Sequence, residues 1–241
     1  LMANLKNRKE EKDYFLELLK KSSIVLEDEV IDKLLKYMNI VYEKNKVINL
    51  TAIREKDEIL EKHLVDSLFL MELIHDEDKQ IIDVGTGAGF PGLVLAIVYP
   101  EKQFLLVDSV RKKVEFLNEV IDELEIENAV TSSERAEELI KDRRESFDVA
   151  LCRGVAKLRI IIEYMIPFLK VKGRFLAQKL TVDEIPESQN ALNSLNAEIV
   201  ETHMFELPTI RDERVIIEIV KKKETSDKYP RKTGVPSKNP L

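Results

Sequence analysis

The residues best suited to binding chemistry lie in one stretch, residues 80–92, which reads Gln-Ile-Ile-Asp-Val-Gly-Thr-Gly-Ala-Gly-Phe-Pro-Gly. Four of the chain's 7 glycines fall here, at positions 85, 87, 89 and 92. Glycine has no Cβ and adopts positive φ readily, so such a turn lets a ligand approach the backbone closely. Apolar segments flank the turn. They predict a strand, a glycine turn and a helix whose N-terminus faces the ligand.

The spacing of these glycines narrows the class of ligand. Phe90 stands where a dinucleotide fingerprint that begins at Gly85 would place its third glycine, and no P-loop lysine follows. A nucleoside without phosphates fits better. Asp108, which ends the next predicted strand, can accept hydrogen bonds from ribose hydroxyls, and Asp83 can face a ligand ammonium. An acidic residue before Gly-x-Gly-x-Gly is typical of S-adenosylmethionine methyltransferases.

Length and composition limit the remaining possibilities. The 241 residues, 44% of them hydrophobic, fit one large domain or a domain with an appendage. No apolar run approaches the roughly 18 residues of a membrane helix, and we see no signal peptide, so we expect a cytoplasmic protein without membrane contact. Cys152 is the only cysteine, which excludes an intrachain disulfide and a cysteine-based zinc site. We expect Cys152 to be an inert core residue and expect no metal.

The charge is divided unevenly along the chain. The net charge is −7, but residues 221–241 carry +5 and leave −12 for the rest. An acidic body with a basic tail suits an anionic partner that binds from one side. A solvated terminus would give the same pattern, and charge alone leaves both interpretations open.

Hydrophobic periodicity predicts the elements that position the glycine turn. We expect helices over residues 8–22, from an N-cap at Asp28 through Tyr42, and over 57–74. Strands and helices then alternate, which predicts a parallel, doubly wound sheet with helices on both faces. The expected strands are 80–84, 103–108, 129–131, 147–152, 173–178, 197–205 and 213–221, and the expected helices are 91–99, 110–124, 136–140 (capped by Ser132 or Ser133), 158–169 and 183–195.

The ends of this pattern lead to two further expectations. No helix separates the last two strands, so they should form an antiparallel hairpin. The last dozen residues contain three prolines and should lack regular structure.

Several motifs give the chain a resemblance to one family. It resembles the bacterial 16S rRNA guanine-N7 methyltransferases, the RsmG or glucose-inhibited division protein B family. The Gly-Phe-Pro-Gly segment at 89–92 and the Pro-Ser-Lys-Asn-Pro-Leu ending at 236–241 are the most specific matches. Gly154 and Leu180 depart from the family's pattern. The other matching segments are 49–51, 63–68, 83–88, 108–109, 135–137, 147–148 with 153, 173 with 178–179, and 229–235.

The resemblance implies a Rossmann-like class I methyltransferase fold with a mostly parallel seven-stranded sheet. It implies a helical N-terminal extension (1–78), a methyltransferase domain (79–222) and a basic tail (223–241). The resemblance also implies contacts between S-adenosylmethionine and Gly85, Gly87, Phe90, Asp108, Ser109, Ala136, Glu137 and Arg153. We add Asp83 to these expected contacts because of its position directly before the turn. The expected substrate contacts are His63, Lys179, Arg231, Lys232 and Lys238. The implied partner is 16S rRNA, in its 530-loop region, or the 30S subunit, which a monomer would bind.

The implied reaction requires no catalytic side chain. Guanine N7 carries a free lone pair and no proton at neutral pH, so alignment with the methyl group is sufficient. His63, Asp66 and Ser67 might suggest a hydrolase triad, but they fall within two helical turns, where that geometry is hard to build. We expect a capping or lid role for His63, so that an alanine variant is weakened but active. The alternatives are a nucleoside-binding module and a nicotinamide-dependent oxidoreductase, and the glycine spacing favours the methyltransferase.

Overall fold

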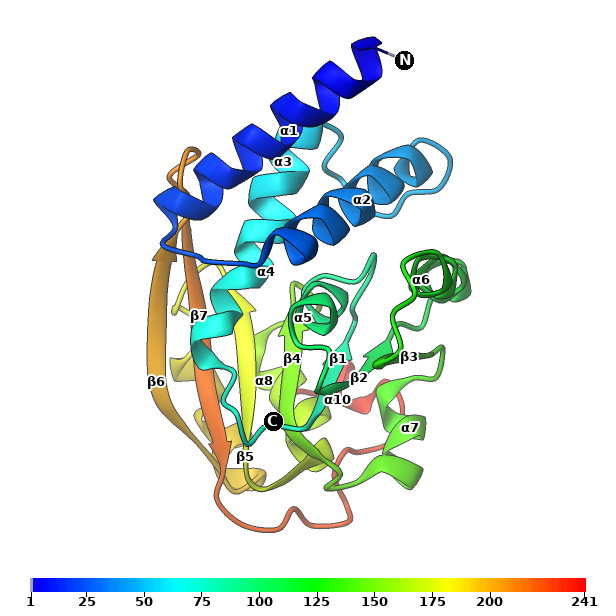
Figure 1. Ribbon diagram of the computed structural model, residues 1–241. Helices are drawn as coiled ribbons and strands as arrows, with labels where there is room; N and C mark the ends of the chain where they lie inside the picture. Colours follow the sequence, from blue (N-terminus) through cyan, green and yellow to red (C-terminus); the bar gives the residue numbers. More distant parts are fainter. Residues whose placement is uncertain (1) are drawn as a thin grey trace.

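The predicted sheet is present in a computed structural model that describes the backbone of residues 2–241 and the side chains from residue 8 onward (Figure 1). Its seven strands have the order β3-β2-β1-β4-β5-β7-β6. β7 is antiparallel to both β5 and β6, and the other neighbours are parallel, which confirms the predicted C-terminal hairpin. The strands are β1 Gln80–Val84, β2 Gln103–Val107, β3 Ala129–Ser132, β4 Phe147–Arg153, β5 Leu169–Lys179, β6 Ala197–Glu206 and β7 Glu213–Lys221.

The central strands are apolar on both faces because helices cover both. Ile81 belongs to the hydrophobic cluster on one face of the sheet, and its neighbour Ile82 belongs to the cluster on the other. Leu106 and Leu105 on β2 are divided between the two faces in the same way. This alternation across a fully covered sheet explains why the strands appear in the sequence as continuous apolar runs.

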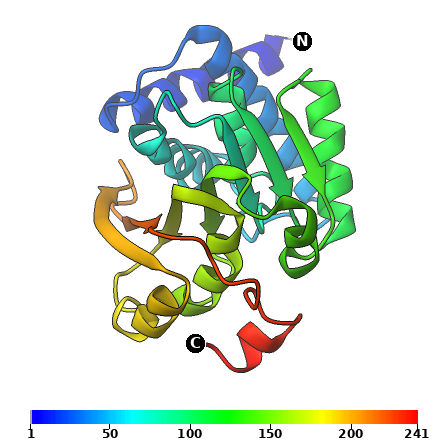
Figure 2. The ribbon, with the colours of Figure 1, turned by 90° about the horizontal axis from the view of Figure 1, so that it is seen from below.

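The helices divide into two layers. One layer contains α1 Met2–Lys21, α2 Asp28–Asn45, α3 Lys56–Ile59, a π-helix Leu60–Val65, α4 Asp66–Leu68, a 3-10 helix Phe69–Leu73, α5 Gly92–Val98 and α6 Arg111–Glu123. The other contains α7 Ala136–Arg143, α8 Leu158–Met165, a 3-10 helix Ile166–Phe168, a 3-10 helix Pro186–Ser188 and α9 Gln189–Ser194. Figure 2 shows the N-terminal helices and the C-terminal segment on opposite sides of the sheet. Within residues 2–241, no helix is long and apolar enough to cross a membrane.

Several predicted boundaries were wrong. The expected uniform helix over 57–74 contains a π-helical turn at its centre. Asp28 is the first helical residue, with Glu27 at the N-cap position, and Arg135 occupies that position before α7 in place of either serine. No side chain makes a capping bond at the N-terminus of either helix, and the carbonyls of Glu27 and Arg135 accept the first helical N–H groups. β5 begins at Leu169, so the helix before it is shorter than expected.

The C-terminal tail is packed against the fold. Residues 235–238 form a short helix, α10 Val235–Lys238, so the expectation of no regular structure was wrong. Tyr229 is buried among α7, α8 and the sheet, and Arg231 binds the fully buried carboxylate of Glu163 through its backbone N–H, Nε and Nη2. Lys221 is also fully buried, with its ammonium 2.7 Å from Glu145. Lys221, Tyr229 and Arg231 therefore fix the tail to the fold, although several of its other residues are exposed.

Replacing Tyr229 with alanine is expected to destabilise the protein by about 3 kcal/mol, because large buried side chains leave a cavity when truncated. Urea unfolding followed by circular dichroism measures this change. Lys238→Ala, an exposed position of the same tail, should alter the unfolding free energy by less than about 0.5 kcal/mol. Equal stabilities of the wild type and Tyr229→Ala would show that the tail is not part of the cooperative fold.

Candidate active site

Backbone hydrogen bonds and two carboxylates hold the glycine turn between β1 and α5. The N–H groups of Gly85 and Thr86 both donate to the carbonyl of Val107, at 2.8 and 3.0 Å. The Gly87 N–H donates to Asp108 Oδ2 at 2.9 Å, and the Gly92 N–H donates to Asp83 Oδ2 at 2.7 Å. The turn therefore lies across the carboxyl ends of β1 and β2, where open α/β sheets bind ligands.

Glycine is required at two positions of the turn. Gly85 has φ +74°, and a Cβ at this position would overlap Cγ2 of Val155 from the loop after β4. Gly89 has φ +102°, and a Cβ there would overlap the hydroxyl of Tyr37, which donates to the carbonyl of Ala88. Any side chain at these two positions would therefore force the turn away from its neighbours.

Asp108 organises the turn and retains capacity to bind a ligand. Its Oδ2 accepts from Gly87, and its Oδ1 accepts from the Val110 N–H at 2.9 Å. An ionised carboxylate offers about four acceptor sites, so about two remain. Ribose hydroxyls are donors that could use them.

Asp83 is fully buried beneath the turn. Its Oδ1 has no hydrogen-bond partner among the described residues, whereas its Oδ2 accepts from Gly92. Burial raises the pKa of Asp83 to about 6, although the nearby Thr86 hydroxyl and the hydrogen bond from the Gly92 N–H oppose this rise. A cationic group close to Asp83 would therefore stabilise the ionised carboxylate.

A hydrogen-bonded chain of side chains borders the turn. His63 stacks on Phe90, with ring centroids 4.5 Å apart and an angle of 9° between the planes. His63 Nε2 lies 2.6 Å from Thr51 Oγ1, and Nδ1 lies 2.9 Å from Arg153 Nη2. Burial, with the nearby charge of Arg153, lowers the pKa of His63 to about 3, so the ring is neutral near pH 7. Arg153 also donates to Asp66 Oδ2 at 3.1 Å.

These contacts do not form a hydrolase triad. Ser67 donates its hydroxyl to the backbone carbonyl of His63 at 2.6 Å, and the two nitrogens of the His63 ring contact Thr51 and Arg153 instead. Ser67 therefore does not contact the imidazole ring, and the triad of His63, Asp66 and Ser67 does not form.

A cavity of about 550 Å³ adjoins the turn beyond the ends of β4 and β5. Val155, which covers Gly85, and His63, which stacks on Phe90, form part of its wall. Lys179 also lines the cavity, but its ammonium already lies 3.0 Å from Glu184. The other lining residues are Ile53, Lys62, Asp66, Arg153, Gly154, Ala156, Gln178, Leu180, Thr181, Glu184 and Arg214.

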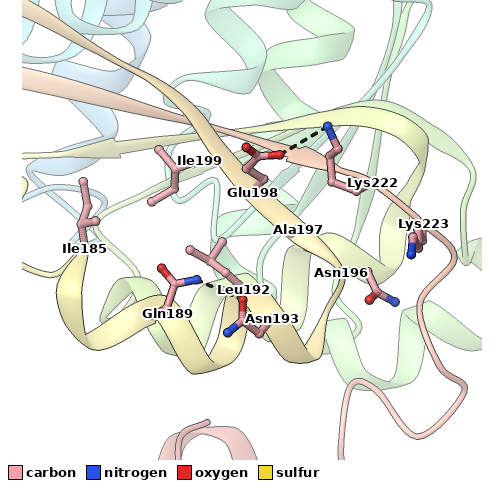
Figure 3. Close-up of a pocket in the computed structure, with 10 residues that line it drawn as sticks. All are labelled: Ile185, Gln189, Leu192, Asn193, Asn196, Ala197, Glu198, Ile199, Lys222 and Lys223. Carbon is pink, nitrogen blue, oxygen red and sulfur yellow. Dashed lines mark hydrogen bonds and ion pairs between the residues drawn. The ribbon is translucent and has the colours of Figure 1, made fainter.

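A second cavity, of about 530 Å³, lies between α9, β6 and the segment after β7 (Figure 3). An ion pair between Glu198 and Lys222, 3.3 Å apart, crosses one side of it. None of the site residues predicted from the sequence lines this cavity, so it does not contribute to the candidate site.

The structure brings Asp83, Asp108 and Arg153 to the glycine turn. The predicted tail residues lie away from the cavity. Ala136 and Glu137 begin α7, and the Gly234 N–H lies 3.4 Å from the Glu137 carboxylate. Arg231 is engaged by Glu163, whereas Lys232 and Lys238 are exposed. None of the three tail cations lines the cavity.

Sequence reasoning missed two residues of the site. Thr51 was recognised within a motif but received no role, because only the fold brings it to His63. Tyr37 received no role from the sequence, yet its hydroxyl supports the glycine turn. A buried tyrosine needs a partner for its hydroxyl, which was the available clue.

The sheet order and the glycine turn at the strand ends define the Rossmann-like fold of class I methyltransferases. A solved S-adenosylmethionine-dependent O-methyltransferase from Thermotoga maritima shares the fold, with a TM-score of 0.51 and 17% identity over 78% of this chain and 73% of that one. The family model described as GidB, rRNA small subunit methyltransferase G, matches residues 30–215. The chain belongs to this family of rRNA methyltransferases.

Two relatives illustrate how far the similarity extends. A ribosomal RNA small subunit methyltransferase G from Fusobacterium nucleatum is 54% identical over 231 residues, which cover 95% of this chain and 100% of that protein. A protein of the same name from Acetivibrio thermocellus is 44% identical over 90% of both chains. The similarity therefore includes the N-terminal helices as well as the cofactor domain.

The buried carboxyl of Asp83 should make stability depend on pH. Its raised pKa means that the folded state holds this proton more tightly than the unfolded state. The stabilisation of the folded state by this bound proton is therefore present at low pH and is lost as the pH rises from about 4 through 6. The substitution Asp83→Asn would keep an acceptor for Gly92 without the charge. We expect the free energy of unfolding of this variant, relative to that of the wild type, to rise by on the order of 2 kcal/mol between about pH 4.5 and 7.5. Urea unfolding of the ligand-free proteins at both pH values measures this change.

Asp148→Asn provides a control of opposite sign. Burial alone would raise the pKa of Asp148, but hydrogen bonds from Lys170 and from the N–H groups of Gln80 and Lys79 lower it. This substitution should therefore become more destabilising as the pH rises through the range in which Asp148 ionises. An Asp83→Asn difference that is the same at both pH values would contradict the account of Asp83.

Proposed function

We propose that this rRNA methyltransferase transfers the methyl group of S-adenosylmethionine to N7 of one guanine in the 530-loop region of 16S rRNA. We propose that it acts as a cytoplasmic monomer on the free RNA or on the 30S subunit. The main support is the cavity beyond the ends of β4 and β5, because Val155 joins its wall to the glycine turn, so that a base in the cavity would lie beside a cofactor on the turn. The name shared by the relatives supports the RNA substrate.

In this proposal the cofactor lies along the glycine turn. Gly85, Gly87 and Phe90 form the surface beneath it, and Asp108 accepts hydrogen bonds from the ribose hydroxyls, with Ser109 adjacent. Ala136 and Glu137 flank the adenine at the start of α7. Asp83 balances the ammonium of the methionine part, which would give its Oδ1 a partner. Arg153 lies between Phe90 of the turn and the cavity, and in this proposal it binds the carboxylate of the cofactor.

Transfer of the methyl group then needs no proton acceptor. The N7 lone pair attacks the methyl carbon as the bond to sulfur breaks, so the sulfonium becomes a neutral thioether and the purine gains the positive charge. The protein contributes alignment, which is worth several kcal/mol in well-oriented reactions. The neutral His63 ring is compatible with this reaction, because an imidazolium near N7 would oppose the positive charge that develops on the purine.

The RNA would reach the cavity across basic side chains. We propose that Lys232 and Lys238 contact phosphates from the exposed tail, and that His63 and Lys179 border the guanine. Arg231 has its own role in holding the tail through Glu163, so it contributes less to RNA binding. In this arrangement, residues 1–78 form the substrate side, 79–222 the cofactor domain and 223–241 the basic tail.

Methylation with radiolabelled cofactor tests the proposal. Purified protein is incubated with 16S rRNA or with 30S subunits that lack the modification, and the product is digested and identified by mass spectrometry. We expect N7-methylguanosine at a single position of the 530-loop region. Incorporation at another atom of the base, or no incorporation into either substrate by a protein that binds the cofactor, would overturn it.

A further inference from the structure

We propose that Thr51 and His63 are positioning residues for Arg153, and that the Thr51–His63–Arg153 chain holds the guanidinium against the cofactor turn. The inference rests on the proposed role of Arg153 in binding the cofactor. It gives a function to two residues from the segment before the sheet, neither of which needs to touch a reacting atom.

The orientation of the His63 ring is fixed from three directions. One face stacks on Phe90, which belongs to the glycine turn. Nε2 meets Thr51 and Nδ1 meets Arg153, at 2.6 and 2.9 Å, on a side chain that is only 9% exposed. A rotation of the ring would break the stacking and both hydrogen bonds together.

The donors and acceptors of this chain have one consistent assignment. A guanidinium has only donors, so Arg153 must donate to His63 Nδ1. The neutral ring then carries its proton on Nε2 and donates it to Thr51 Oγ1. The Thr51 hydroxyl therefore selects the tautomer that Arg153 needs. In other histidine sites too, a hydrogen-bond acceptor at one ring nitrogen decides which nitrogen carries the proton.

Thr51 is itself held in place by the backbone around it. Asn45 Oδ1 accepts the N–H groups of Leu50 and Thr51, at 2.9 and 3.0 Å. Thr51 Oγ1 also accepts the Ile53 N–H at 3.2 Å. The hydroxyl is therefore presented to His63 by a loop whose polar groups are paired.

Arg153 keeps donors free for a ligand after these contacts. Its Nη1 donates to Asp66 at 3.1 Å and to the Lys62 carbonyl at 3.3 Å, and its Nη2 donates to His63. At most three of its five N–H groups are used, which leaves two. The guanidinium carbon lies 5.6 Å from the Phe90 ring centroid, so these donors are close to the cofactor turn.

The backbone at His63 supports a functional interpretation. His63 lies in the π-helical turn Leu60–Val65, and such turns are frequent at functional sites. Glu61 in the same turn is buried and accepts the N–H groups of Thr209 and Ile210, at 2.6 and 3.0 Å. The β6–β7 loop therefore braces the turn that carries His63.

Calorimetric titration with S-adenosylmethionine tests the inference. Thr51→Val keeps the shape of the side chain but removes the acceptor, and should raise the Kd about tenfold, as expected for one lost hydrogen bond. Thr51→Ser keeps the hydroxyl and should stay within about twofold of the wild type. Thr202→Val, at an exposed position of β6, is the matched control and should bind like the wild type.

A double-mutant cycle separates positioning from a structural effect. If Thr51 acts through Arg153, Thr51→Val should have no further effect on the Kd in an Arg153→Met background. His63→Leu provides a second arm, because it removes both ring nitrogens and with them the acceptor for Arg153. It should weaken binding as Thr51→Val does. Urea unfolding of each variant confirms that folded protein is compared.

The outcomes distinguish this inference from the proposed function. If the wild type does not bind S-adenosylmethionine, the proposed function fails. If the wild type binds but Thr51→Val binds equally well, only the positioning role is overturned. Additive effects of Thr51→Val and Arg153→Met on the Kd would also overturn it, since each residue would then act alone.

Discussion

The site depends on two carboxylates that accept backbone N–H groups of the glycine turn. Asp83, from the end of β1, binds the Gly92 N–H, and Asp108, from the end of β2, binds the Gly87 N–H. A turn rich in glycine has much conformational freedom to lose, and these bonds fix it before any ligand arrives. The ionised form of Asp83 is unfavourable in its buried position, so a positively charged group of a cofactor close to Asp83 would stabilise the carboxylate.

The second requirement is that the turn be joined to the neighbouring cavity. The stacking of His63 on Phe90 makes that connection, and the same ring contacts Thr51 and Arg153. The N-terminal helices share one hydrophobic cluster with α5 and α6, so the segment that carries His63 is packed against the helix that follows the turn. The cofactor turn and the cavity are therefore two parts of one packed unit.

Much of this could be predicted from sequence because the signals are local. Strands buried on both faces appear as apolar runs, and glycines that need positive φ, such as Gly85, cluster where the backbone turns. The rest depends on contacts between distant residues. Thr51 meets His63 only after the helices pack, and the π-helical turn has no pattern of its own. The tail looked like free basic chain, because nothing near Arg231 in sequence reveals its pairing with Glu163.

The central claim is that the glycine turn and Asp108 form the cofactor-binding site. Calorimetric titration with S-adenosylmethionine tests this claim most directly. The account predicts one site per chain in the wild type and binding at least about tenfold weaker in Asp108→Ala, whose side chain cannot hold the turn or accept from ribose. Asp122→Ala, at an exposed position of α6, should bind like the wild type. NAD should give no heat of binding. Unchanged affinity in Asp108→Ala, or binding of NAD in place of S-adenosylmethionine, would contradict the account.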